Sequence, residues 1–201
     1  MFSNLEMKIT NKYILTIIII LFPVLSFSQE YSYKIDTEHF SLGFLVEHAG
    51  YAKTLGMFRK IEGGFNHDDE KNQITNVEII IDTSSVFTNH EKRDSHLRSP
   101  DFLDTQQFSQ MVFTAENVQI TENETTMNGK LTLLGITKNI TLRGKINKIA
   151  EYPFGFAPPV VMGISARGSF KRSDFGMMYA VEEKLVGDLV ELIIEFEAKR
   201  N

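Results

Sequence analysis

The densest group of chemically active side chains is the segment RDSHLRSPDFLD, residues 93–104. Together with His90 just before it, this segment offers imidazole and carboxylate groups, which are common protein ligands of Zn²⁺. On a helix, His90 and Asp94 stand four residues apart and share one face. His96 follows Asp94 by only two residues and therefore projects away from it. At most two ligands share a face, so the pattern favours a solvated, salt-bridged helix over a metal site.

Other catalytic signatures are absent or incomplete. The chain has no cysteine and no Gly-x-Ser-x-Gly turn that would expose a nucleophilic serine. The triplet Asp174-Phe175-Gly176 lacks the glycine-rich loop and lysine strand of phosphoryl transfer, so we interpret it as a turn. The net charge of -5, with both signs interspersed, argues against nucleic-acid binding. The sequence therefore predicts a protein that is not an enzyme and uses no metal or other cofactor.

His48 is the histidine with the most informative neighbours. In an extended chain it shares a face with Phe40, Leu42, Phe44 and Val46, so it should point where these apolar side chains point. One interpretation is a core histidine that is hydrogen-bonded to the backbone or to a nearby tyrosine. The other is a polar group inside a cavity, beside the polar end of a ligand. The sequence alone leaves both open.

The elements that position these residues are strands, because the dominant sequence period is two. Apolar and polar residues alternate along residues 74–81 and again along 190–196, which is typical of strands with one buried face. Turn signals such as Gly63-Gly64 and residues 67–72 separate the alternating runs. Strands are predicted over residues 31–36, 40–48, 55–61, 74–81, 111–121, 125–134, 139–149, 161–171 and 190–196. Eight or nine strands at this spacing predict an all-β sandwich or barrel.

One stretch departs from this period. Asn89 can cap a short helix that ends at Leu97, and Ser99-Pro100-Asp101 has the composition of a second helix start. Residues 93–104 are thus predicted to lie on a short helical excursion between strands. No repeat or low-complexity linker interrupts the remainder, so a single domain is predicted over residues 29–201.

The first 28 residues differ from the rest. Lys8 and Lys12 precede the apolar run of residues 13–22, and Ser26-Phe27-Ser28 provides a small-x-small site. This pattern predicts a signal peptide over residues 1–28, cleaved near Ser28, and hence a periplasmic or secreted protein. The alternative is an uncleaved N-terminal membrane anchor, since about 20 apolar residues suffice to span a bilayer. Without cysteine, an exported domain must gain its stability from packing and hydrogen bonds.

The apolar faces of the predicted strands repeatedly offer Phe, Leu, Ile and Met. Such a lining suits a flexible hydrocarbon, and an eight-stranded barrel is just wide enough for one elongated ligand or for its own side chains. A ligand cavity and a filled core are equally compatible with the composition. Strands of about eight residues predict a barrel about 20 Å tall.

Several short motifs, in order, resemble the YceI-like family of exported, lipocalin-like polyisoprenoid-binding proteins. The resemblance spans residues 33–198. The motifs that carry it are FLVEH at 44–48, GMF at 56–58, SSV at 84–86, RDSHLRSPDF at 93–102, GKLTLLGIT at 129–137, RSDFG at 172–176 and VGDLV at 186–190. Each motif alone is weak, but their order across one domain makes the resemblance specific.

The resemblance implies an extended eight-stranded antiparallel barrel that binds a long isoprenoid lipid, either a polyprenyl phosphate or the tail of an isoprenoid quinone. It further implies non-enzymatic transport or storage, a homodimer, and a membrane that serves only as the lipid source. The expected polar contacts are His48, Arg93 and Arg98, because guanidinium groups bind phosphate oxygens in a bidentate fork. The expected apolar lining is Phe40, Leu42, Phe44, Val46, Phe58, Phe113, Leu131, Met162 and Phe170. Two alternatives remain: a filled barrel acting as a stress or interaction module, and an enzyme that uses His48 as general base on a buried lipid.

Overall fold

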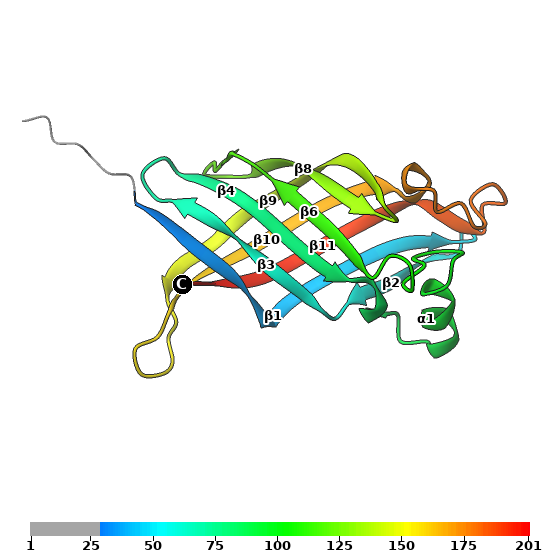
Figure 1. Cartoon of the computed structure of the whole chain (residues 1–201), viewed down its shortest axis with the longest axis horizontal. Coiled ribbons are helices and arrows are strands. Elements are labelled where there is room, and N and C mark those ends of the chain that lie inside the picture. The colour runs from blue at the N-terminus through cyan, green and yellow to red at the C-terminus, as the bar shows by residue number, and fades with distance from the viewer. Residues whose placement is uncertain (1–28) are drawn as a thin grey trace, which may run out of the picture.

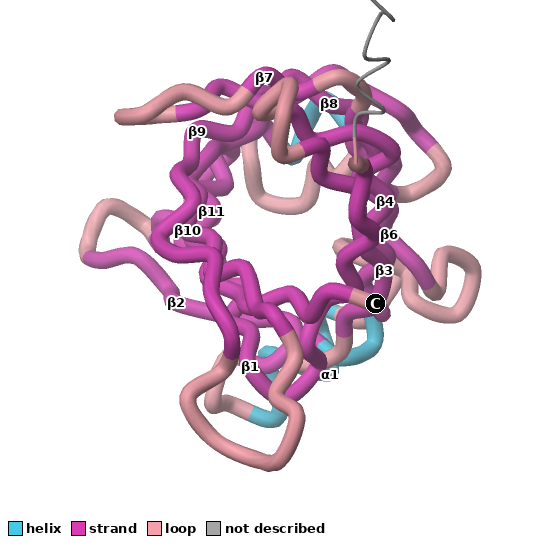
Figure 2. Tube along the Cα trace, turned by 90° about the vertical axis from the view of Figure 1, so that its left-hand side faces the viewer, coloured by secondary structure: helices cyan, strands magenta, loops and turns pink. Residues whose placement is uncertain are grey.

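The strands join into one antiparallel sheet that closes on itself (Figures 1 and 2). The computed structural model describes residues 29–201, and the predicted signal peptide lies outside the described residues. The helical elements in the described part are α1 (Glu91–Leu97) and two 3-10 turns, η1 (Thr83–Ser85) and η2 (Arg172–Phe175). The strands there are β1 (Glu30–His48), β2 (Ala52–Phe58), β3 (Ile61–Asp68), β4 (Gln73–Asp82), β5 (Val86–Phe87), β6 (Gln110–Ala115), β7 (Val118–Gln119), β8 (Thr125–Leu133), β9 (Ile136–Glu151), β10 (Val160–Lys171) and β11 (Val186–Arg200).

Some of these strands are consecutive segments of one wall strand. β1 pairs with β3 through residues 30–34 and with β2 through residues 42–48, so β2 and β3 follow one another along the same neighbour. β6 and β7 follow one another along β4 in the same way. The wall of the described chain thus has eight strands, and the pairing of β11 with β1 closes it. The predicted eight-stranded antiparallel barrel with a short helical excursion is confirmed.

The barrel is taller than the sequence suggested. β9 and β11 contain 16 and 15 residues. At about 3.4 Å per residue such strands extend about 50 Å, and a tilt of about 40° leaves a wall about 40 Å tall. The expected height near 20 Å was wrong because it assumed strands of about eight residues. Strands were predicted only where apolar and polar residues alternate, so their lengths were underestimated. The exposed ends of β9 lack that alternation although they remain paired.

A bulge bends β1 in its middle, where the strand turns a corner in Figure 1. Ile35 lies opposite Ala198, whereas the next paired residue of β1, Phe40, lies opposite Phe196. Residues 36–39 therefore stand against a single residue of β11. The strands predicted over residues 31–36 and 40–48 are one strand with this bulge in it.

Asp36 holds the bulge in place. Its buried carboxylate accepts hydrogen bonds from Lys199 Nζ at 2.8 Å, from His39 Nδ1 at 2.8 Å and from the Glu38 backbone N–H at 3.0 Å. Burial opposes ionisation of Asp36, but these donors outweigh it and hold the pKa of the carboxyl at about 2. The closing seam of the barrel is thus built around an ionised carboxylate.

The segment β3 was missed because Gly63-Gly64 was interpreted as a turn. Gly63 lies within the strand with a φ of 122°, and a Cβ there would stand 2.1 Å from the carbonyl oxygen of Glu78 on β4. The register between β3 and β4 shifts between Gly64 and Asn66. The glycines therefore serve a close backbone approach at a bulge.

α1 and the turn after it lie beside one end of the barrel, at the lower right of Figure 1, and Leu97, Phe102 and Leu103 from this segment line the interior. The helix begins one residue later than predicted, because His90 is the cap and accepts a hydrogen bond from the Arg93 backbone N–H. Residues 99–101 do not start a second helix. They form a turn in which the Phe102 N–H donates to the Ser99 carbonyl at 3.0 Å. Residues 93–104 are thus a structural cap on the barrel.

The opposite end, which carries the C-terminus, is filled by side chains. Tyr33, His67, Met162 and Ala198 are 1%, 3%, 0% and 0% exposed. Tyr33 stacks on Phe65 with ring centroids 5.5 Å apart, and its hydroxyl accepts a hydrogen bond from the Arg200 side chain. These residues form what we call the packed end. In residues 29–201 no helix combines the length and the apolar composition needed to cross a bilayer.

Candidate ligand-binding cavity

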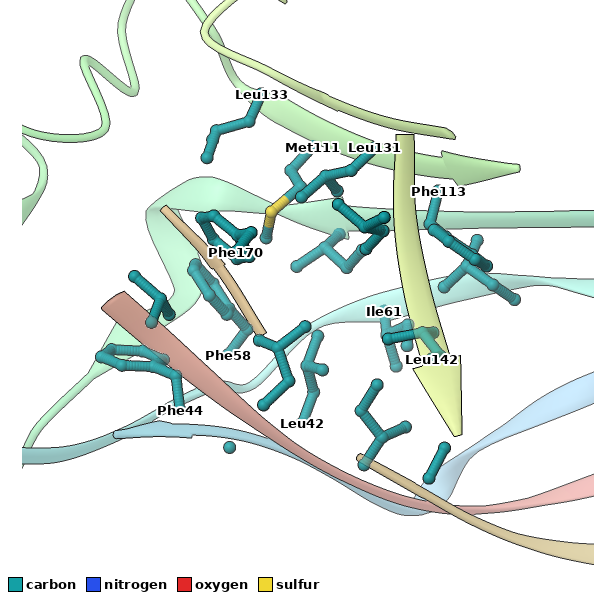
Figure 3. Close-up of a pocket in the computed structure, with 18 of the residues that line it drawn as sticks. Leu42, Phe44, Phe58, Ile61, Met111, Phe113, Leu131, Leu133, Leu142 and Phe170 are labelled. Atoms are coloured by element: carbon teal, nitrogen blue, oxygen red, sulfur yellow. The ribbon is translucent and has the colours of Figure 1, made fainter. Parts of the chain in front are cut away.

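Between α1 and the packed end the barrel is hollow. A cavity of about 520 Å³ is lined by side chains from all eight strands of the wall. The residues labelled in Figure 3 are Leu, Ile, Phe and Met, and their side chains point into the barrel from facing strands. The volume falls within the roughly 300–1,000 Å³ that is usual for small-molecule sites. A cavity this apolar suits a hydrocarbon chain.

Two aromatic side chains lie against glycines of the wall. A Cβ added to Gly56 would stand 2.2 Å from Cζ of Phe44, and one added to Gly129 would stand 2.3 Å from Cζ of Phe113. Each ring therefore occupies the space that a neighbouring side chain would otherwise fill. Because the rings are accommodated at the wall, part of the interior remains open.

Seven of the nine residues predicted as apolar lining do line the cavity: Leu42, Phe44, Val46, Phe58, Phe113, Leu131 and Phe170. Met162 does not, because it pairs with Ala198 and is fully buried in the packed end. Phe40 does not either. It follows the bulge of β1 and packs against the core. Both residues were assigned to the correct face of their strands, but their position along the barrel axis makes them core.

Most of the polar lining lies at the end covered by α1, which we call the mouth. His48 and Thr54 reach it from β1 and β2, Arg93 and His96 from α1, and Tyr179 from the loop between β10 and β11. The His96 ring packs edge-on against Tyr179, with centroids 4.9 Å apart. The cavity thus has an apolar body and a polar end.

The two predicted arginines have different positions. Arg93 lines the mouth, and its Nε and Nη2 atoms donate to the hydroxyl and the carbonyl of Thr88 at 2.7 and 2.8 Å. Arg98 does not line the cavity, and its Nη1 points to the Val86 carbonyl at 3.4 Å. The prediction that Arg98 contacts the ligand is therefore not supported by its position. Arg98 is the C-cap residue of α1, and a contact between it and a ligand stays a prediction.

His48 lines the cavity at its rim and is exposed. It is not the core histidine of the first interpretation. The face was predicted correctly from the alternation, but His48 is the last residue of β1, so it lies where the barrel opens. This position is compatible with contact to the polar end of a ligand.

Arg172 also lines the mouth, although the sequence analysis did not select it. It is 2% exposed, and its guanidinium donates to four backbone carbonyls at 2.8–2.9 Å: those of Met177, Tyr179, Val186 and Gly187. Burial lowers the pKa of Arg172. The only signal in the sequence was its place in the RSDFG motif. Arg172 fixes the loop that forms one side of the mouth.

The residues considered as metal ligands have separate partners. His90 caps α1, the Asp94 carboxylate accepts hydrogen bonds from the N–H and hydroxyl of Thr88, and His96 Nε2 lies 2.8 Å from an Asp101 oxygen. These three side chains do not converge on one point.

A different group of potential ligands lies on the closing seam. Donor atoms of Asp36, His39 and Glu197 lie within 4.8 Å of one another. Lys199 already places an ammonium 2.8 Å from Asp36, so the positive charge that this carboxylate requires is supplied by the protein itself. We assign no metal to this group.

A closed antiparallel barrel with an apolar cavity and a polar mouth defines a lipocalin-like binding barrel. The model of the YceI-like domain matches residues 33–198, and the chain belongs to this family. Protein YceI of Salmonella arizonae and that of Salmonella paratyphi B are each 36% identical over 167 residues, which covers 82% of this chain and 85% of each relative. The recognition from sequence motifs is confirmed.

Solved structures share the fold. The Campylobacter jejuni YCEI protein is 28% identical and superposes with a TM-score of 0.68, covering 77% of this chain and 90% of that chain. A polyisoprenoid binding domain from Saccharophagus degradans, described as implicated in plant cell wall breakdown, is 14% identical. It covers 86% of this chain and 100% of its own, with a TM-score of 0.60. At this identity the likeness concerns the fold alone.

Proposed function

We propose that this protein binds a long isoprenoid lipid in its cavity and transports or stores it without chemical change. The observation that carries the proposal is the apolar cavity of about 520 Å³ that ends in a polar mouth. Membership in the YceI-like family and the barrel fold of a polyisoprenoid binding domain support it. The cavity argues against the alternative of a filled barrel. The ligand class is a polyprenyl phosphate or an isoprenoid quinone.

The energetics favour a hydrocarbon ligand. Each methylene group buried contributes about 0.8 kcal/mol, so a few isoprene units offset association costs of several kcal/mol. The lining of β11 runs from Val186 to Phe196. At about 3.4 Å per residue and a tilt of about 40°, this is about 25 Å along the axis. A longer polyprenyl chain must fold back or leave part of itself outside.

We propose that the head group lies at the mouth, beside His48 and Arg93. Thr88 orients the Arg93 side chain through two hydrogen bonds. The positive guanidinium group of Arg93 would form an ion pair with a phosphate head group. Arg172 adds a second, buried positive charge on the same side. A quinone head would accept hydrogen bonds from the same donors. Tail and head would thus be recognised at separate places in one cavity.

We also propose that the protein acts outside the cytoplasm, in the periplasm or after secretion. The support is the N-terminal pattern of lysines, an apolar run and a small-x-small site near Ser28. N-terminal sequencing of the protein from its native host tests this: a start at Gln29 is expected. A retained N-terminus would instead identify an anchored protein.

The experiment that tests ligand binding is native and denaturing mass spectrometry of protein purified without detergent. A stoichiometric lipid that is released on denaturation is expected, and the native mass also distinguishes a monomer from the homodimer that the family resemblance implied. Leu131→Trp should fill the cavity and abolish the adduct, because Leu131 faces the interior. Leu189→Trp, on the exposed side of β11, is the matched control.

Two outcomes would contradict the proposal. A clean protein mass that does not shift with added polyprenyl phosphates or quinones would favour the interaction module. A lipid that is chemically altered during incubation with the protein would indicate an enzyme.

A further inference from the structure

Apolar side chains are exposed around the mouth of the cavity. Tyr51 in the turn between β1 and β2 is 90% exposed. In the loop between β10 and β11, Leu185, Met178 and Tyr179 are 53%, 48% and 45% exposed. We call these four residues the mouth rim. Both loops lie at the end of the barrel that carries α1, on the right of Figure 1.

The two loops of the mouth rim form one surface. The Ala49 backbone N–H donates to the Leu185 carbonyl at 2.9 Å, which joins the β1–β2 turn to the β10–β11 loop. Arg172 holds the β10–β11 loop from beneath through its four hydrogen bonds to carbonyls. The exposed side chains therefore project from a supported backbone.

The mouth rim is continuous with the cavity. Leu185 and Tyr179 are about half exposed and also belong to the cavity lining. An apolar path thus leads from the interior onto the outer surface. Contiguous exposed apolar surface of this kind usually marks an interaction site.

The charges beside the mouth rim are mixed. Glu182, Glu183 and Lys184 occupy the exposed part of the same loop. Electrostatic attraction to an anionic surface would therefore not drive binding at the mouth rim. Tyr, Leu and Met side chains instead suit the apolar boundary of a bilayer, where tyrosine places its ring among acyl chains and its hydroxyl in water.

We propose that the mouth rim docks on the surface of a lipid bilayer and inserts Tyr51 and Leu185, so that the cavity opens directly toward the membrane. The inference rests on the proposed lipid-binding function. A lipid tail would then pass from the bilayer to the cavity along the apolar side chains of the mouth rim, without crossing water. Docking through apolar contacts also requires no anionic lipid.

The chain contains no tryptophan, so single reporters can be introduced without background. Tyr51→Trp places one reporter on the mouth rim. Phe154→Trp places a matched reporter on an aromatic residue that is 74% exposed in the β9–β10 loop, at the opposite end of the barrel. Each variant is mixed with vesicles of phosphatidylcholine. The emission of Tyr51→Trp is expected to shift to the blue and to be quenched by brominated acyl chains, whereas the emission of Phe154→Trp is expected to stay unchanged.

A second variant tests the contribution of Leu185. In the Tyr51→Trp background, Leu185→Ser should weaken vesicle partition about tenfold, whereas Phe156→Ser at the opposite end should leave it unchanged. An unchanged emission of the mouth-rim reporter would overturn the proposal. Insertion of the Phe154→Trp reporter in place of the mouth-rim reporter would also overturn it, because the β9–β10 loop would then be the docking element.

The same samples separate this proposal from the lipid-binding function. Mass spectrometry of the protein recovered from vesicles reports whether the cavity has taken up lipid. For this readout the vesicles also contain a polyprenyl phosphate or an isoprenoid quinone. Docking on them without any uptake would leave the mouth rim as a membrane contact and overturn the proposed ligand. Uptake without insertion of the mouth-rim reporter would keep the ligand and overturn the docking.

Discussion

Lys199 Nζ lies 2.8 Å from Oδ2 of Asp36, across the pairing of β1 and β11 that closes the barrel. The Asp36 side chain is 4% exposed, and its pKa is held at about 2. Because the folded-state pKa is depressed, this ion pair stabilises the fold at pH values above about 4 and the stabilisation is lost as the pH falls toward about 2. The depression corresponds to roughly 2 kcal/mol.

Asp36→Asn is accordingly expected to lower the free energy of unfolding by about 2 kcal/mol near neutral pH. The difference from the unmodified protein should shrink as the pH is lowered from about 4 to about 2. Urea denaturation at several pH values measures this. Glu38→Gln, an exposed carboxylate in the same bulge, is the control and should change stability little. A difference that is independent of pH would mean that Asp36 acts through its shape alone.

Arg172→Met should destabilise the mouth. It removes the donors of four hydrogen bonds to carbonyls, one of them buried and three partly buried. Unsatisfied buried groups cost about 1–3 kcal/mol each before relaxation. We expect a loss of several kcal/mol in unfolding free energy and faster hydrogen exchange in residues 176–187. Arg172→Lys should rescue only part of it, because an ammonium lacks the planar fork of a guanidinium. Full rescue by lysine would show that charge alone matters there.

Gly56→Ala should reduce the cavity. The new methyl group would overlap the Phe44 ring, whose Cζ lies 2.2 Å from the added Cβ, and would displace it toward the interior. We expect lipid affinity to fall at least tenfold. We also expect overpacking to lower the free energy of unfolding by about 1–3 kcal/mol. Native mass spectrometry and denaturation measure the two effects. The double variant Gly56→Ala, Phe44→Leu should recover binding, and its failure to do so would exclude the ring as the cause.

Met162→Ala tests whether the packed end contributes to stability alone or also to lipid binding. Met162 is fully buried outside the cavity, so its truncation should cost about 2–5 kcal/mol of stability. Lipid binding by the remaining folded protein should be unchanged. Phe170→Ala, within the lining, should instead lower lipid affinity. An equal loss of affinity in both variants would mean that the ligand reaches the packed end.

Sequence reasoning recovered the barrel because each strand buries one face, and that constraint imposes a period of two. The same period assigned Phe44 and Phe170 to the inner face. It says nothing about depth along the axis, which is why Met162 was placed with the lining and His48 remained ambiguous.

Other features depend on pairing between distant segments. The bulge at residues 36–39 is defined only by the register between β1 and β11. Gly63 has the composition of a turn, and only its approach to Glu78 explains why it lies within a strand. Arg172 was missed because a buried cation is rare, and its carbonyl partners are brought together only by the folded loop.

The packed end and the mouth make the two ends of the barrel unequal. Tyr33, Met162 and Ala198 are buried at one end, whereas the cavity lining reaches exposed residues such as His48 and Leu185 at the other. A lipid bound as proposed, with its head group at the mouth, would enter tail first and leave head first. Under the proposed function, the membrane or partner that meets the mouth would therefore set the direction of lipid transfer.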